Sequence, residues 1–119
     1  MTETSVPEPL AFRVDSRDVQ GASVVEVAGE VDAHTAPTVR DAVEAAIVPG
    51  ARVIVDLSGV SFLDSTGLGI LVTALKHVRE ADGTLDLVVT SPRVLKVFEL
   101  TGLDVVIAIH EELGALLDS

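Results

Sequence analysis

The chain has 119 residues, of which 48% are hydrophobic and 23% charged, and its formal net charge is −11 at pH 7. This length suits one compact domain, and the apolar content excludes disorder over most of the chain. The negative charge disfavours nucleic acids and membrane surfaces as partners, and the lack of cysteine excludes disulfides, thiol catalysis and thiolate metal sites.

The first ten residues, 1–10, are polar and include Pro7 and Pro9, so we expect a flexible lead-in. They lack the basic and apolar regions of a signal peptide, and no apolar stretch of the chain is long enough to span a bilayer. We therefore expect a cytoplasmic protein whose single folded domain covers residues 11–119.

The first half of this domain has strand signals, then a helix signal, then a strand signal. Gly21 supplies a turn between two strands, which predicts an antiparallel hairpin. Thr35 can cap a helix that has Pro37 in its first turn. The predicted elements are strands over 12–19 and 23–31, a helix after 35 that ends before 49–50, and a doubly buried strand over 52–57.

The second half alternates helix and strand signals. Ser91 and Pro92 are typical of a helix start, and Gly102 can end that helix in a left-handed conformation. The predicted elements are a loop over 58–64, a helix from about 64–65, a strand over 85–89, a helix over 91–102, a strand over 105–109 and a helix over 111–117. Repeated β-α-β units imply parallel strands, so we predict an α/β domain with about four helices and a mixed, mostly parallel sheet.

The segment over 55–71, VDLSGVSFLDSTGLGIL, carries the clearest functional signal. It places Ser65 at or beside a helix N-terminus, at the carboxyl end of a parallel strand, where sites of α/β proteins gather. Gly67 and Gly69 weaken the first turns of that helix, at a cost of roughly 1 kcal/mol each. Either Asp64 or Ser65 is simply the N-cap and the glycines serve packing, or a partner approaches this turn closely.

Phosphorylation of Ser65 is physically available as a switch. A phosphate adds roughly two negative charges, and the dipole and N–H groups of a helix N-terminus tolerate such an anion. Asp64 adds like-charge repulsion to it. Phosphate on Ser65 would therefore repel a docked partner without unfolding the domain.

Three segments together resemble a known family. VDLSGVSFLDSTGLG over 55–69, GEVDAHTAP over 29–37 and SPRVLKVFELTGL over 91–103 are similar to the STAS-domain anti-sigma factor antagonists. The resemblance covers nearly the whole chain after the lead-in. It implies a single STAS domain that is not an enzyme and that regulates transcription by partner switching.

The resemblance also implies partners and site residues. The unphosphorylated protein would bind an anti-sigma factor with serine kinase activity and so free a sigma factor; phosphorylation of Ser65 would break the complex, and a serine phosphatase would restore it. Asp64 would be the acidic neighbour of Ser65, and Thr66 and Gly67 part of the docking turn. Asp32 would contact the partner, or it would be a solvated loop acid or a cap for the following helix. The negative net charge either suits a partner with a basic docking face or only keeps the protein soluble.

The same residues allow several alternatives to this interpretation. Thr66 also has a hydroxyl and could be a minor phosphate acceptor. A hydrolase would need a Gly-x-Ser-x-Gly elbow, which the sequence lacks, and a base, for which the three histidines are poor candidates. A receiver site on Asp56 or Asp64 would need an acidic cluster after the first strand, and a nucleotide site would need a P-loop; the sequence has neither. We therefore expect no cofactor and no metal. The remaining alternative is a STAS scaffold, or a transporter-associated subunit, that binds partners without phosphorylation.

Overall fold

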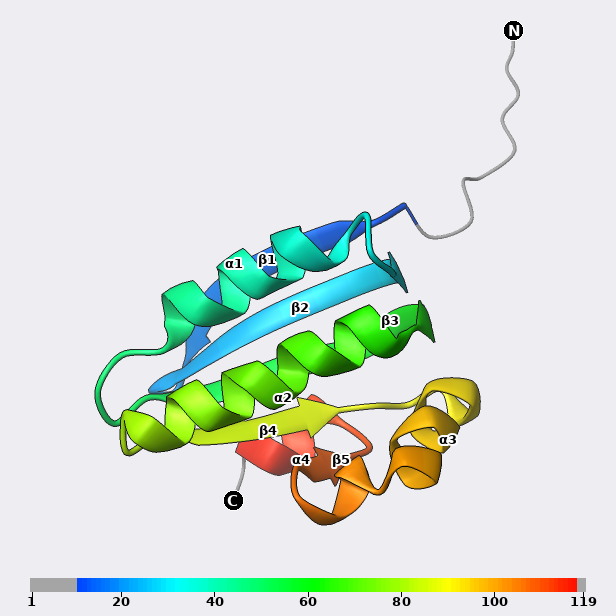
Figure 1. The fold of residues 1–119 in the computed structure, drawn as a ribbon. Helices are drawn as coiled ribbons and strands as arrows, with labels where there is room; N and C mark the ends of the chain where they lie inside the picture. The colour runs from blue at the N-terminus through cyan, green and yellow to red at the C-terminus, as the bar shows by residue number, and fades with distance from the viewer. Residues whose placement is uncertain (1–10, 118–119) are drawn as a thin grey trace, which may run out of the picture.

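The computed structural model describes residues 11–117, so the expected lead-in over 1–10 lies outside the described part of the chain. These residues form a five-stranded sheet with the order β1-β2-β3-β4-β5 (Figure 1). The first pair is antiparallel and the other pairs are parallel, which confirms the predicted hairpin and mixed sheet. The strands are β1 (Arg13–Val19), β2 (Ala22–Val31), β3 (Arg52–Leu63), β4 (Thr84–Val88) and β5 (Ala108–His110).

Four α-helices are described, as the sequence predicted, together with one short 3-10 helix. Figure 1 shows α1 and α2 side by side over one face of the sheet, called the front face here. The other face, the reverse face, packs against α4. The helices are α1 (Ala36–Ala46), α2 (Ser65–Glu80), α3 (Pro92–Thr101), α4 (Leu113–Leu117) and the 3-10 helix η1 (Leu103–Val105).

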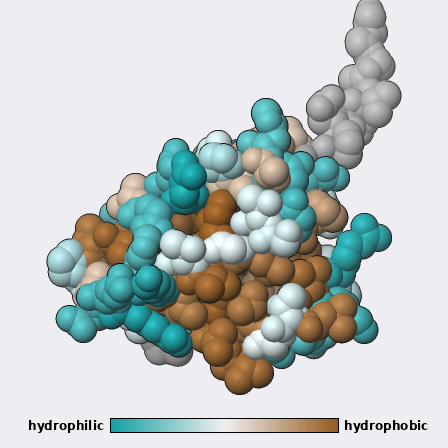
Figure 2. All heavy atoms as spheres, viewed as in Figure 1, coloured by the Kyte–Doolittle hydropathy of each residue, from teal (hydrophilic) through white to brown (hydrophobic). Residues whose placement is uncertain are grey.

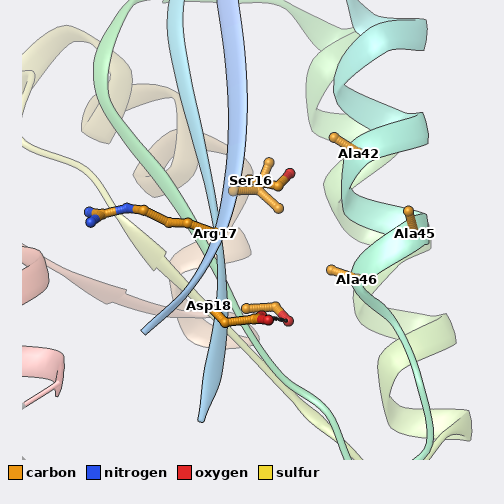
Figure 3. A pocket seen from close by; sticks show the side chains of 8 residues that line it. Ser16, Arg17, Asp18, Ala42, Ala45 and Ala46 are labelled. Carbon is orange, nitrogen blue, oxygen red and sulfur yellow. Dashed lines mark hydrogen bonds between the residues drawn. The ribbon is translucent and has the colours of Figure 1, made fainter. Parts of the chain in front are cut away.

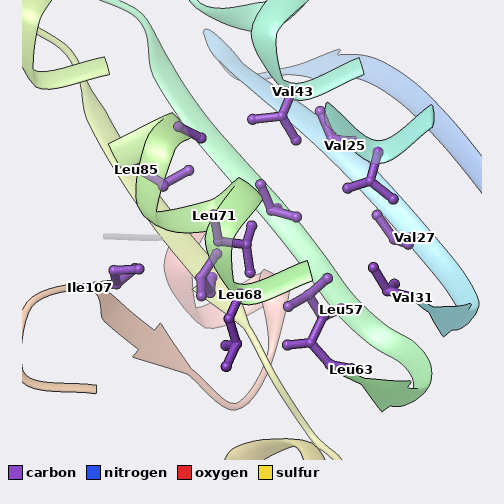
Figure 4. Packing of buried hydrophobic residues seen from close by; sticks show 14 of the residues in the cluster. Val25, Val27, Val31, Val43, Leu57, Leu63, Leu68, Leu71, Leu85 and Ile107 are labelled. Carbon is purple, nitrogen blue, oxygen red and sulfur yellow. The ribbon is translucent and has the colours of Figure 1, made fainter. Parts of the chain in front are cut away.

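The core is aliphatic, as the scarcity of aromatic residues predicts. Its main cluster joins the front face of the sheet to α1, α2 and α3, and Figure 4 shows leucines of α2 against valines and leucines of the strands. Phe98 of α3 is its largest fully buried side chain. Ile54 packs on the reverse face with Val24 and Leu116. Both faces of β3 are thus buried over the predicted range, which confirms that part of the prediction.

The predicted loop over 58–64 is wrong, because β3 continues to Leu63. Its last residues pair with β2, from Ala28 opposite Gly59 to Val31 opposite Leu63, with register shifts on the way. A Cβ atom at Gly59 would lie 3.0 Å from the Cβ atom of Ala28, so glycine permits this close pairing. Ser and Gly suggested a loop, but a neighbouring strand supplies the hydrogen bonds that keep the segment extended.

The predicted strand over 105–109 is also partly wrong. Gly102 has a φ of 77° and ends α3 in the left-handed region, as predicted. The chain then forms η1, in which the N–H of Val105 donates to the carbonyl of Gly102 at 3.2 Å. The strand is consequently shorter and later than expected, over Ala108–His110, and α4 begins at Leu113 rather than 111.

Candidate functional site

The candidate site lies where β2 and β3 end side by side, near the start of α2 (Figure 1). Val31 and Leu63 are register partners, and the N–H of Asp64 donates to the carbonyl of Val31 at 3.1 Å. Asp32 and Asp64 each follow one of these paired residues. Two acidic residues 32 positions apart therefore follow neighbouring strand ends at the same end of the sheet. The segments over 29–32 and 60–66 are called the β2–β3 tip below.

The N-cap of α2 is Asp64, and Ser65 is the first helical residue. One carboxylate oxygen of Asp64 accepts the N–H groups of Thr66 at 2.9 Å and Gly67 at 3.1 Å. Its carbonyl accepts the N–H of Leu68 at 3.0 Å. The side chain of Ser65 is thereby left out of the capping arrangement, and both Ser65 and Thr66 are exposed. This resolves the choice of N-cap that the sequence left open.

The two glycines of α2 differ in their surroundings. A Cβ atom at Gly67 would clash with a methyl group of Leu63 and lie 2.9 Å from Val31, so a side chain there would disturb the packing of α2 on the tip. A Cβ atom at Gly69 would meet nothing within 4 Å. Close packing inside the chain therefore accounts for the buried Gly67, and it does not account for Gly69.

Asp32 organises the turn that leads from β2 into α1. One of its carboxylate oxygens accepts the N–H groups of His34 at 2.9 Å and Thr35 at 3.1 Å. The hydrogen bond from Thr35, and after it the one from His34, hold the pKa of Asp32 below its ordinary value. Thr35 is the N-cap residue of α1, as expected, but its side chain makes no capping hydrogen bond, because its hydroxyl donates to the carbonyl of Glu30 at 2.8 Å. The Asp32 side chain thus holds the turn before α1 and is not the cap of that helix, whose N-cap residue is Thr35. Contact of Asp32 with a partner stays a prediction.

The structure has two other surface features, a cavity and an apolar surface. A cavity of about 240 Å³ between the β1–β2 hairpin and α1 is lined by small and polar side chains, Ser16, Asp18 and Ala42 among them (Figure 3). Figure 2 shows apolar side chains over α2, α3 and η1. Within residues 11–117 there is no group of three or more His, Cys, Asp or Glu residues that could hold a metal ion. No helix in that range is both long and apolar enough to cross a membrane.

Removal of the cap is expected to weaken the start of α2. Asp64→Ala leaves two N–H groups of the first turn without their acceptor, so the free energy of unfolding should fall by about 1 kcal/mol. Asp64→Asn keeps an oxygen acceptor and should lose clearly less. Urea unfolding followed by circular dichroism measures both variants. Equal losses would show that charge, and not the accepted hydrogen bonds, stabilises this end of the helix.

Comparisons with known proteins agree on one family. The STAS domain model matches residues 13–116. The anti-sigma-B factor antagonist of Listeria monocytogenes is 39% identical over 108 residues, which cover 90% of this chain and 94% of the relative. A crystal structure of an anti-sigma factor antagonist from Mycobacterium paratuberculosis is 33% identical, with a TM-score of 0.79 and 97% of each chain covered. A structure of the Bacillus cell fate determinant SpoIIAA in its phosphorylated form is 28% identical, with a TM-score of 0.65 over 89% of this chain and 96% of that one.

Proposed function

Since this chain belongs to the STAS-domain family of anti-sigma factor antagonists, we propose that it binds an anti-sigma factor and is released when Ser65 is phosphorylated. The anti-sigma factor antagonist role rests on relatives that bear this name and cover nearly the whole chain. The switch at Ser65 is a finer proposal. In it, the partner is a serine kinase as well as an anti-sigma factor, and a serine phosphatase reverses the modification.

One observation carries the proposal: Ser65 is exposed at the first position of α2, while its neighbours are held in place. Asp64 caps the helix and Gly67 packs against Leu63, so the backbone on both sides of Ser65 is fixed. A hydroxyl on a rigid and accessible turn can enter the active site of another protein without local unfolding. Thr66 is exposed as well, so position along the turn must distinguish the two hydroxyls.

The proposed reaction is a phosphoryl transfer. The Oγ atom of Ser65 attacks the γ-phosphorus of ATP held by the kinase, the bond from that phosphorus to the bridging oxygen breaks, and ADP leaves. The hydroxyl proton passes to a base on the kinase. In the reverse branch, water attacks the phosphorus of phosphoserine, which returns the hydroxyl and releases inorganic phosphate. The described residues of this chain supply only the acceptor, placed by α2.

The cap of α2 makes the phosphate more effective as a repelling group. Two N–H groups that would otherwise draw in an anion already bind the Asp64 carboxylate, at 2.9 and 3.1 Å. The phosphate would add its charge next to that carboxylate and near Asp32. The anionic charge therefore stays at the surface and acts on the docked partner.

Site mapping tests the proposal directly. We expect the mass of one phosphoryl group to be added when the protein is incubated with ATP and an anti-sigma factor that has an ATP-binding kinase site. Intact mass and peptide mapping should place it on Ser65 in the wild type and in Thr66→Ala, with none added to Ser65→Ala. Transfer to Thr66 alone, or undiminished transfer to Ser65→Ala, would contradict the assignment of Ser65.

A further inference from the structure

One of the three phenylalanines lies at the surface of the β2–β3 tip. Phe98 is fully buried and Phe12 packs against the main cluster, whereas 43% of Phe62 is exposed. Phe62 precedes Ser65 by only three positions. An exposed aromatic ring gives up the free energy that its burial would contribute to folding. The exposure of Phe62 therefore needs a physical explanation.

The pairing of the strands shows which way Phe62 points. Phe62 is the register partner of Glu30, and Leu63 is the register partner of Val31. Paired residues of parallel neighbours share a face of the sheet. Leu63 and Val31 are buried in the main cluster on the front face, while Glu30 and Phe62 are both exposed. The ring of Phe62 therefore lies on the reverse face of the tip, opposite the face on which α2 packs.

The tip extends beyond the strands on either side of it. β4 pairs with β3 only as far as Asp56 opposite Val88, and β1 pairs with β2 only as far as Ala28 opposite Arg13. Phe62 lies six residues beyond the last β3–β4 pair. The reverse face packs against α4 near Ala22, Val24 and Ile54, at the start of the strands and far from the tip. The α3 helix also packs against β3, within the main cluster, but it leaves the ring of Phe62 partly exposed. A partner can thus reach both this ring and the start of α2.

The charged residues of the tip itself are all acidic, and Arg13, which lies opposite Ala28 on β1, is paired with Asp15 at 2.9 Å. Glu30, Asp32 and Asp64 belong to the tip, whose two segments contain no Lys or Arg. Among residues 11–117 none of these three carboxylates forms an ion pair. An exposed aromatic ring on an acidic tip complements an apolar pocket with a basic rim.

We propose that Phe62 is an anchor of the docking interface and inserts into an apolar, basic-rimmed pocket of the anti-sigma factor. This inference rests on the proposed function, because it takes the partner to be the protein that meets Ser65. The partner then contacts the tip on both sides, with Ser65 at the front and Phe62 at the reverse. Anchors of this kind carry most of the binding energy of an interface, whereas isolated exposed apolar residues carry little.

The test compares Phe62→Ala with Val48→Ala, which removes an exposed apolar side chain at the opposite end of the sheet, between α1 and β3. Titration calorimetry measures the Kd of each unphosphorylated variant for the anti-sigma factor. We expect Phe62→Ala to raise the Kd at least about tenfold and Phe62→Leu to raise it less, while Val48→Ala leaves it unchanged. The melting temperature of Phe62→Ala should stay close to that of the wild type.

Two outcomes would overturn the inference. If Phe62→Ala binds like the wild type, the ring does not contact this partner. If Phe62→Ala melts at a much lower temperature and its folded form binds normally, the ring stabilises the domain and is not an anchor for this partner. Including Ser65→Glu in the same series separates the two proposals. If Ser65→Glu loses binding and Phe62→Ala binds normally, only the anchor role of Phe62 is contradicted. If Ser65→Glu binds normally, the phosphorylation switch is contradicted.

Discussion

Phosphorylation of Ser65 is expected to raise the Kd for the anti-sigma factor by about a hundredfold or more, because repulsion between like charges at an interface costs several kcal/mol. Ser65→Glu should show the same direction with a smaller effect, since one carboxylate has less charge than a phosphate. Ser65→Ala should bind like the wild type and remain bound in the presence of ATP, because it adds no charge and accepts no phosphate. Titration calorimetry or surface plasmon resonance measures all three.

A matched control places the same charge elsewhere. Thr84→Glu adds a carboxylate at an exposed position at the start of β4, away from the tip, and should leave the Kd unchanged. Far-ultraviolet circular dichroism of each variant should match that of the wild type, because the anion at Ser65 lies outside the core and near a helix N-terminus. If Thr84→Glu weakens binding as much as Ser65→Glu does, the net charge of the protein, and not the position of the added charge, controls the complex.

Truncating Phe98 is expected to have the largest effect on stability. Phe98 is fully buried between α3 and the sheet, so Phe98→Ala removes its apolar contacts and leaves a cavity. Such changes cost about 3–5 kcal/mol, which is a large share of the roughly 5–15 kcal/mol that stabilises a domain. The melting temperature should fall by roughly 10–20 °C. Thermal unfolding followed by circular dichroism or calorimetry measures this.

Two further variants keep this prediction decisive. Phe98→Leu retains most of the buried volume and should lie between the wild type and Phe98→Ala, which gives a measurable protein even if the alanine variant does not fold. Phe62→Ala makes the same chemical change at the tip, where the ring is 43% exposed, and should cost about 1 kcal/mol at most. Similar losses for Phe62→Ala and Phe98→Ala would contradict the burial that the structure assigns to these two rings.

Much of the fold could be predicted because its signals are local. The helix stripe that includes Leu68, Leu71 and Leu75 appears in the sequence with helical spacing, and all three side chains are buried. The left-handed end of α3 at Gly102 was likewise predicted from a single residue type. The length of β3 was missed because its last residues are extended only through pairing with β2. Pairing between residues some thirty positions apart leaves no local pattern to read.

The sequence by itself determined which residues bear the candidate chemistry: Ser65 with Asp64 before it and Thr66 after it, at the end of a strand and the start of a helix. Only the tertiary structure decided their environment. Parallel pairing of β2 with β3 brought Asp32 next to Asp64, and the capping bonds of Asp64 left the Ser65 side chain exposed. The same pairing placed Phe62 on the reverse face of the tip. The physical reason is that residue type and spacing are properties of the chain alone, whereas exposure and proximity depend on which strands lie side by side.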